Sequence, residues 1–163
     1  VPSASDVQII SVPALKKIVI NIGVKHAIAD KKNMEVAAGV LEQISGQKAK
    51  VTAAKKSISS FKLREGEKIG LVVTLRGKRM YDFFGKLVTI VLPRIKDFHG
   101  IKKTSFDTRG NYTLGLSEYS VFPEVDLGKV ERVQGLEITI NTTAPDSKSA
   151  FALLKHLGMP FQK

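Results

Sequence analysis

The residues best suited to bind a ligand lie between positions 55 and 66, a segment that combines cations, hydroxyl groups and one aromatic side chain. We name this segment the basic loop; it contains Lys55, Lys56, Lys62 and Arg64, Ser57, Ser59 and Ser60, and Phe61. Cations bind phosphates, hydroxyls bind sugars and bases, and an aromatic ring stacks on unpaired bases. The loop therefore suits a folded RNA. For Phe61 two roles stay open, base stacking and hydrophobic anchoring of the loop itself.

A second group of cations, Arg76, Lys78 and Arg79, lies at the junction between a predicted strand and a predicted helix. Lys78 and Arg79 fall in the first turn of that helix, where backbone N–H groups that lack an intrahelical partner also attract phosphate. This junction is therefore a second candidate contact with nucleic acid.

The excess positive charge is confined to the middle third of the chain. The whole sequence carries a net charge of +11, and residues 46–103 contain 15 Lys and Arg against four Asp and Glu. The flanking residues are balanced, with 11 of each sign. Concentrated charge repels itself, so this segment indicates a polyanionic partner, first nucleic acid and second an anionic membrane. The alternative is a solvated basic face that only aids solubility.

No arrangement typical of a catalytic or metal site accompanies this charge. Ser59 and Lys62 match the Ser-x-x-Lys spacing, but the other parts of a penicillin-binding site are missing. Gly77-Lys78 resembles the end of a phosphate loop, yet Val72 occupies the position of its first glycine. The chain has no cysteine, and its three histidines are scattered. We therefore expect a binding protein, not an enzyme, with no metal and no cofactor.

Length and composition predict one folded domain, because 163 residues that are 43% hydrophobic suffice for a core. The longest apolar run, Leu87 to Leu92, ends at Pro93 and is far shorter than the roughly 20 residues of a membrane span. The sequence begins with Val1 and shows neither a signal nor a transit peptide, so we expect that earlier residues precede it.

The elements that must position these residues follow from the spacing of apolar side chains. Strands are predicted at residues 14–22, 50–53, 69–75, 111–116 and 136–142. Helices are predicted from an Asp30 cap to Gly46, from 78 to 91, and from Asp146 or Ser147 to His156. This mixed order predicts an α+β fold over residues 1–163, a single domain with a largely antiparallel sheet, helices packed on one face and the long basic loop.

Short motifs along most of the chain match one protein family. They include Asn21-Ile22-Gly23-Val24, Ser45-Gly46-Gln47-Lys48, Phe61-Lys62-Leu63-Arg64-Glu65-Gly66, Leu92-Pro93-Arg94-Ile95-Lys96-Asp97-Phe98, Phe122-Pro123-Glu124 and Gly158-Met159-Pro160-Phe161-Gln162-Lys163. With these motifs in order and nearly without gaps from about Val12 onward, the sequence closely resembles the bacterial-type family of large-subunit ribosomal protein five, which binds 5S ribosomal RNA.

The resemblance implies a noncatalytic protein of the central protuberance of the large subunit. By motif, its contacts with 5S RNA fall on or beside the exposed sheet face, at Asn21, Gln47, Thr74 and Arg76, joined by Lys48, Lys78 and Arg79. Asn, Gln and Thr both donate and accept hydrogen bonds, and Arg forks onto phosphate. For Asn21 and Gln47, strand-end capping and turn formation are the alternative roles.

The resemblance also implies partners beyond 5S RNA: large-subunit ribosomal RNA, P-site tRNA, a small-subunit head protein and neighbouring proteins of the central protuberance. The tRNA-facing residues fall in the basic loop, at Lys55, Lys56, Ser57, Ser59, Phe61, Lys62 and Arg64. The intersubunit bridge falls on Arg94, Lys96, His99, Glu118 and Asp126. We expect the ribosome of a bacterial cytoplasm or of an organelle, and no membrane.

The sequence departs from the family pattern at a few positions. Ala54 and His99 stand where the family often has Arg, and Thr108 replaces a frequent Gly. The family's N-terminal helix has no counterpart here. Two further classes remain as alternatives: a peripheral module that binds anionic membranes, which requires a basic amphipathic helix, and an RNA-modifying enzyme, which requires a catalytic constellation.

Overall fold

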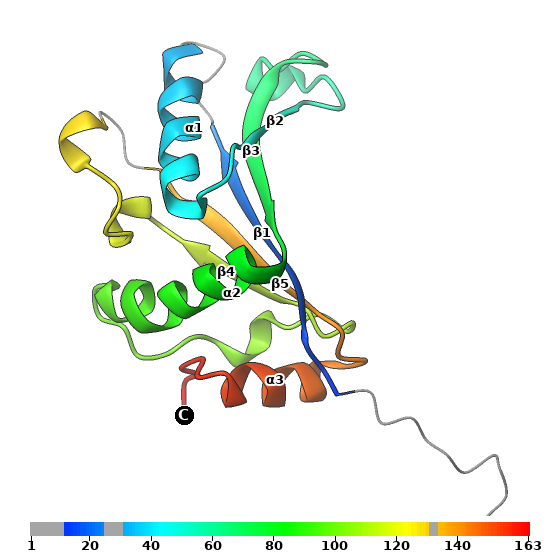
Figure 1. Cartoon of the computed structure of the whole chain (residues 1–163). Helices are drawn as coiled ribbons and strands as arrows, with labels where there is room; N and C mark the ends of the chain where they lie inside the picture. The colour runs from blue at the N-terminus through cyan, green and yellow to red at the C-terminus, as the bar shows by residue number, and fades with distance from the viewer. Residues whose placement is uncertain (1–11, 25–30, 131–133) are drawn as a thin grey trace, which may run out of the picture.

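In the part of the chain that the structure describes, five β-strands form one sheet, and Figure 1 shows how the strands lie side by side. The computed structural model describes residues 12–24, 31–130 and 134–163. The strands are β1 (Leu15–Gly23), β2 (Lys50–Ala53), β3 (Lys68–Leu75), β4 (Tyr112–Leu116) and β5 (Leu136–Thr142). Their spatial order is β2-β3-β1-β5-β4, and every neighbouring pair is antiparallel. The predicted α+β fold is confirmed.

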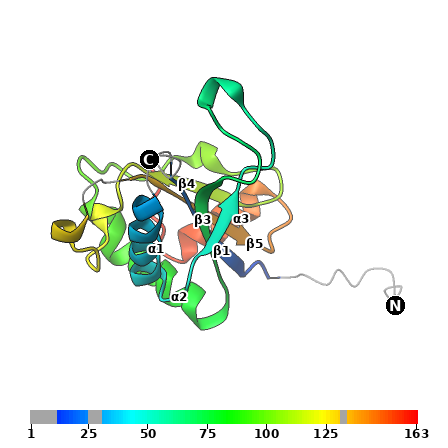
Figure 2. The same cartoon turned by 90° about the horizontal axis from the view of Figure 1, so that it is seen from above.

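The described residues also form three α-helices: α1 (Lys31–Ser45), α2 (Gly77–Lys86) and α3 (Ser147–His156). α1 and α2 lie across the same face of the sheet, and α3 lies along its lower end (Figure 1). The basic loop connects β2 to β3. Figure 2 shows this connection extending beyond the sheet on the side away from α1 and α2. No helix of the described residues is long and apolar enough to cross a membrane.

The central strands alternate buried and exposed residues, which separates an apolar face from a polar one. The helix-covered face is built from Ile18, Ile20 and Ile22 of β1, Leu71, Val73 and Leu75 of β3, and Leu136, Ile138 and Ile140 of β5. Burying one such side chain stabilises the fold by about 1.5–3 kcal/mol, so a slip of one residue in register is strongly disfavoured.

The helix predicted for residues 78–91 is α-helical only in its first part. α2 ends at Lys86, a wider π-type turn follows over Leu87–Val91, and a 3₁₀ turn covers Leu92–Arg94. Two features account for the change. The Thr89 hydroxyl donates to the Gly85 carbonyl at 2.6 Å, and Pro93 cannot supply a backbone N–H to continue the α-helical pattern.

The other helix ends follow the predicted signals. Asp146 accepts a hydrogen bond from the Ser149 N–H at 2.7 Å and caps the start of α3. Gly46 stops α1 in a left-handed conformation, φ +68°, and its N–H donates to the Glu42 carbonyl at 2.8 Å. Asp30, the predicted cap of α1, lies outside the described residues.

Candidate nucleic-acid interface

We call the face of the sheet that points away from α1 and α2 the open face, and Figure 1 shows the two helices on the opposite face. Directly paired residues of antiparallel strands point to the same side, so the register defines its members. One row contains Lys50, Val72, Asn21, Glu137 and Gly115, and the next contains Thr74, Val19, Thr139 and Thr113. This surface offers hydrogen-bond donors and acceptors on a rigid support.

Asn21 and Thr74 are diagonal neighbours on the open face. Asn21 pairs with Val72 and Thr74 pairs with Val19, so the two residues are offset by two positions on adjacent strands. Such positions lie roughly 7–8 Å apart, close enough for one RNA segment to touch both. The strand register therefore brings together two of the predicted contacts that are far apart in sequence.

Gly70 lies close to Thr52 and to the end of β1. A Cβ at Gly70 would lie 2.7 Å from Thr52 Oγ1 and 3.1 Å from the Ile22 carbonyl oxygen, and it would touch Asn21 Oδ1 at an ordinary contact distance of 4.0 Å. Glycine therefore leaves room for the Thr52 hydroxyl and the Ile22 carbonyl. The end of β1 is thus fitted closely to the β2-β3 hairpin.

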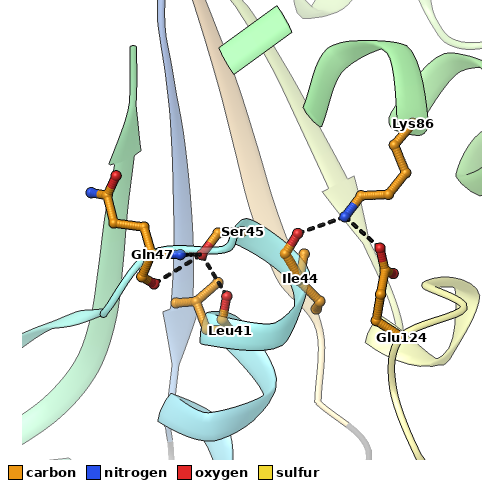
Figure 3. Close-up of polar contacts among 6 residues, drawn as sticks. All are labelled: Leu41, Ile44, Ser45, Gln47, Lys86 and Glu124. Carbon is orange, nitrogen blue, oxygen red and sulfur yellow. Dashed lines mark hydrogen bonds and ion pairs between the residues drawn. The ribbon is translucent and has the colours of Figure 1, made fainter. Parts of the chain in front are cut away.

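Gln47 links three elements at the other end of this surface. Its Nε2 donates to the Thr74 carbonyl at 3.1 Å, and its Oε1 accepts from Arg79 Nη1 at 3.4 Å. The single proton of the Ser45 hydroxyl lies within reach of two carbonyls, that of Leu41 at 2.7 Å and the backbone carbonyl of Gln47 at 3.0 Å (Figure 3). Gln47 therefore shapes a turn, as one reading of the sequence proposes, and also orients a cation.

Cations surround the start of α2. Arg76 precedes the helix with extended backbone, φ −137° and ψ 160°, and Gly77 turns the chain with φ +60°. Arg76, Lys78 and Arg79 are exposed, and the first turn of α2 contains no acidic residue. Lys48, next to Gln47, is exposed as well. This end of the helix favours an anion through both its backbone N–H groups and these side chains.

The basic loop has a defined backbone, although the sequence predicts only a long loop. Ile58 and Leu63 exchange backbone hydrogen bonds at 2.9 and 3.1 Å, and a 3₁₀ turn covers Ser59–Phe61 between them. Lys62 follows with φ +52°. The segment is therefore a loop closed by one isolated β-bridge between Ile58 and Leu63.

The side chains of the basic loop divide into two groups. Ser57 Oγ accepts from the Glu65 N–H at 2.9 Å, so this hydroxyl stabilises the loop itself. Lys55, Lys56, Ser59, Lys62 and Arg64 are exposed. The side chain of Phe61 lies outside what the structure describes, so its two roles stay predictions. The exposed group is free to meet a phosphate backbone.

Three of the five predicted bridge residues meet at one hollow of about 690 Å³ beside β4, which we call the β4 hollow. Arg94, Lys96 and Glu118 line it together with residues 113–116 of β4. His99 and Asp126 do not line it. Asp126 instead accepts from the Gly128 N–H at 3.0 Å and lies 3.8 Å from Lys129, so it stabilises a local turn.

Sequence comparisons agree with this architecture. The model for the C-terminus of the ribosomal protein L5 family matches residues 68–161, and the model for ribosomal protein L5 matches residues 9–64. The large ribosomal subunit protein uL5 of Mycoplasma mycoides is 56% identical over 156 residues, which cover 96% of this chain and 87% of the relative. The chain belongs to the ribosomal protein L5 family. The bacterial-type resemblance seen in the sequence is confirmed.

Two further relatives of the L5 family show the same extent of similarity. The large ribosomal subunit protein uL5 of Chloroflexus aurantiacus is 54% identical, and that of Streptococcus uberis is 56% identical, each over 155 residues. These matches cover 95% of this chain and 86% of each relative. Ribosomal proteins are a structural class, which agrees with the predicted binding protein. The two family models cover parts of one sheet, because the match to residues 9–64 contains β1 and β2 and the match to residues 68–161 contains β3, β4 and β5.

Sequence reasoning missed the role of Lys86 in this L5-family fold. Its Nζ donates to the Ile44 carbonyl at 2.6 Å and to Glu124 Oε1 at 2.7 Å (Figure 3). The same Nζ lies 5.6 Å from the ring centre of Phe83 and 5.8 Å from that of Phe122. Lys86 thus joins the end of α1 to the segment that carries Glu124. The motif Phe122-Pro123-Glu124 was the only signal for this contact.

The described part of this L5-family chain supplies no group of three or more His, Asp or Glu side chains that could hold a metal ion. The membrane alternative requires a helix with a free apolar side, but Met80, Phe83 and Phe84 of α2 are buried in the core. The basic residues of the described segment 46–103 therefore serve a polar surface better than a lipid one.

Proposed function

We propose that this chain is a structural protein of the large ribosomal subunit that binds 5S ribosomal RNA through the open face and the start of α2. The observation that carries the proposal is the contact of Gln47 with both Thr74 and Arg79, beside the exposed Arg76. These groups come from the α1-β2 turn, β3 and α2, and the fold holds them in place before RNA arrives. Preorganised polar groups confer selectivity, and nearby cations supply affinity.

The test compares 5S ribosomal RNA with an unrelated folded RNA of equal length across a salt series. The variant Thr74→Ala/Arg76→Ala should lose the preference for 5S RNA, because it removes a hydroxyl of the open face and an adjacent guanidinium. Its salt dependence should become shallower by about one phosphate contact. Thr108→Ala/Lys148→Ala is the matched control, since it removes one hydroxyl and one charge at exposed positions outside the open face.

Two outcomes separate the proposal from simple charge attraction. Retention of 5S binding at a salt concentration that removes the competitor RNA supports a specific site. If both RNAs dissociate together, and the two double variants behave alike, then only nonspecific phosphate binding is real and the residue assignments fail.

We further propose that the basic loop contacts P-site tRNA and that the surface around Arg94, Lys96 and Glu118 contributes to a bridge with the small-subunit head. The loop extends beyond the sheet on the open side (Figure 2), and its exposed cations suit a partner that binds and leaves. The protein would then act on a bacterial cytoplasmic ribosome, where large-subunit RNA and proteins of the central protuberance would be its other neighbours. The bacterial relatives support this location.

A further inference from the structure

The outer edge of β4 is the end of the sheet, and it borders the β4 hollow. β4 is the last strand in the order β2-β3-β1-β5-β4, and no named strand of the described residues pairs with it on that side. Only its beginning is covered, where the Asp107 N–H donates to the Asn111 carbonyl at 2.9 Å and Phe106 bridges to Tyr112. An unpaired strand edge is a template for another strand.

The hydrogen bond at the start of β4 shows which backbone N–H and C=O groups of this strand point away from β5. In an antiparallel ladder, successive residues direct their N–H and C=O groups alternately to one neighbour and to the other. Because Asn111 directs its carbonyl outward, Thr113 and Gly115 also face outward, while Tyr112 and Leu114 face β5. The Thr113 carbonyl and the N–H and carbonyl of Gly115 therefore face the β4 hollow.

The opposite wall of the hollow completes a groove of suitable chemistry. The chain that follows α2 runs back beneath β4 before entering it (Figure 1), and its residues between 94 and 105 form that wall. Ile95, Phe98 and Ile101 provide apolar surface. Arg94, Lys96 and Lys102 provide three exposed positive charges, against the single carboxylate of Glu118.

We propose that the β4 hollow binds an extended, acidic segment of a protein partner, which adds as a strand to the edge of β4. Main-chain hydrogen bonds to Thr113 and Gly115 would hold its backbone, and alternate side chains would meet the apolar wall and the cations. The phosphate backbone of RNA matches this edge less well than a peptide backbone does, because phosphates only accept hydrogen bonds whereas a peptide supplies N–H donors and C=O acceptors at the spacing of a strand. Strand addition would explain how the proposed bridge surface binds its partner. The identity of that partner, a protein of the small-subunit head, rests on the proposed function.

The test uses the whole chain and a blocked synthetic hexapeptide, Ac-Glu-Val-Asp-Ile-Glu-Val-NH₂. Saturable binding is expected, with shifts of the Gly115 amide resonance in NMR spectra. Gly115→Pro removes the outward N–H and should weaken binding about fivefold to tenfold, whereas proline is tolerated on an exposed strand edge. Gly115→Ala keeps that N–H, and its added Cβ meets nothing within 4 Å, so it is the matched control.

Further probes distinguish strand addition from charge attraction. A hexapeptide with N-methylated alternate amides should bind weakly, and a Lys-containing version should not bind. The proposal is overturned if the N-methylated peptide binds as well as the parent, if Gly115→Pro matches Gly115→Ala, if hexauridylate competes equally, or if no peptide binds.

The bridge proposal has its own readout. Arg94→Ala/Lys96→Ala in assembled large subunits should reduce association with small subunits. If that association falls while the peptide does not bind, the bridge survives and strand addition is wrong. If the peptide binds and association is unchanged, the groove is real and the bridge assignment fails.

Discussion

At the open face, Gln47 and Thr74 belong to different elements, yet the Gln47 side chain donates a hydrogen bond of 3.1 Å to the Thr74 carbonyl. The same side chain accepts a hydrogen bond from Arg79. In the basic loop, the polar contacts instead connect the loop to its own base, as with Ser57 and the Glu65 N–H. Among the described residues, the loop cations form no ion pair. One region holds polar groups in fixed positions, while the other only exposes charge. The first suits a permanent RNA partner and the second a transient one.

The sharpest way to separate the two regions is to remove the charge of the basic loop. In Lys55→Ala/Lys56→Ala/Lys62→Ala/Arg64→Ala, affinity for tRNA should fall about a hundredfold at low salt, because four phosphate contacts are lost. The slope of log K against log salt should become shallower by about three. Filter binding or fluorescence anisotropy measures both. The preference for 5S over an unrelated RNA should persist, and its loss would contradict the division between regions.

A smaller effect is expected when the side-chain amide of Gln47 is removed. Gln47→Ala removes a hydrogen bond to Thr74 and one from Arg79, so 5S affinity should fall about tenfold. Gln43→Ala, at an exposed position of α1, is the control and should bind normally. Binding is measured at fixed salt beside thermal unfolding. A matching loss in both variants would mean that Gln47 acts only as a surface residue.

Two glycines test whether packing or backbone conformation matters in each region. Gly70→Ala should lower the free energy of unfolding by about 1–3 kcal/mol, because the new Cβ meets Thr52 Oγ1 at 2.7 Å and the Ile22 carbonyl at 3.1 Å. Adding Thr52→Ala should recover part of this loss. A Cβ added at Gly66, at the base of the loop, would meet no atom within 4 Å. The φ of +86° still means that Gly66→Ala should lower the free energy of unfolding by about 1–2 kcal/mol.

Urea unfolding measures these differences, and asparagine provides the second control. Gly66→Asn should cost less than Gly66→Ala, since asparagine tolerates left-handed backbone. Equal losses in the two Gly66 variants, or no recovery of Gly70→Ala by Thr52→Ala, would show that the assigned causes are wrong.

The smallest expected effect concerns the turn at residues 107–111, which the Asp107 carboxylate stabilises. Among the described residues of the basic loop, no cation forms an ion pair with a carboxylate. Asp107 accepts from the N–H groups of Asn111 and Arg109 at 2.8 and 2.9 Å, and from Asn111 Nδ2 at 2.9 Å. The hydrogen bond from the Asn111 backbone, above all, lowers the pKa of Asp107. A lowered pKa means that the folded state binds protons less readily than the unfolded one. The resulting stability is present above the unfolded pKa and is lost as pH falls through the folded value.

Thermal unfolding from neutral pH to below about pH 4 tests this linkage. The wild type should lose slightly more stability on acidification than Asp107→Asn, which has no carboxylate to protonate. Parallel curves would contradict the assigned role of the Asp107 carboxylate.

The strands were predictable because one face of each had to be buried. Ile18, Ile20 and Ile22, or Ile138 and Ile140, show a period of two that no other structure accommodates. The α-helical part of residues 78–91 was equally clear from Met80, Phe83 and Phe84. Its continuation was not, because the Thr89 side-chain contact and Pro93 change hydrogen bonding without changing the apolar spacing.

The candidate site was only partly predictable for a related reason. Charge in the basic loop is visible in the sequence, but the contact of Gln47 with Thr74 joins positions 27 residues apart. The contact of Lys86 with Ile44 spans 42 residues. Such pairs depend on how α1 and α2 meet the sheet, and a single sequence carries no periodic signal for them. The β4 hollow is likewise a product of tertiary arrangement.

The position of β1 in the sheet also sets a condition on how the protein is made. β1 lies at the centre, yet it pairs with β5 across 122 residues, from Ile18 to Ile140. During synthesis the edge of β1 that pairs with β5 must therefore stay unpaired until nearly the whole chain has been translated. Long-range pairing of this kind slows folding and leaves strand edges open to aggregation. A nascent chain of this architecture therefore keeps a strand edge unpaired for longer than a helical protein of equal length does.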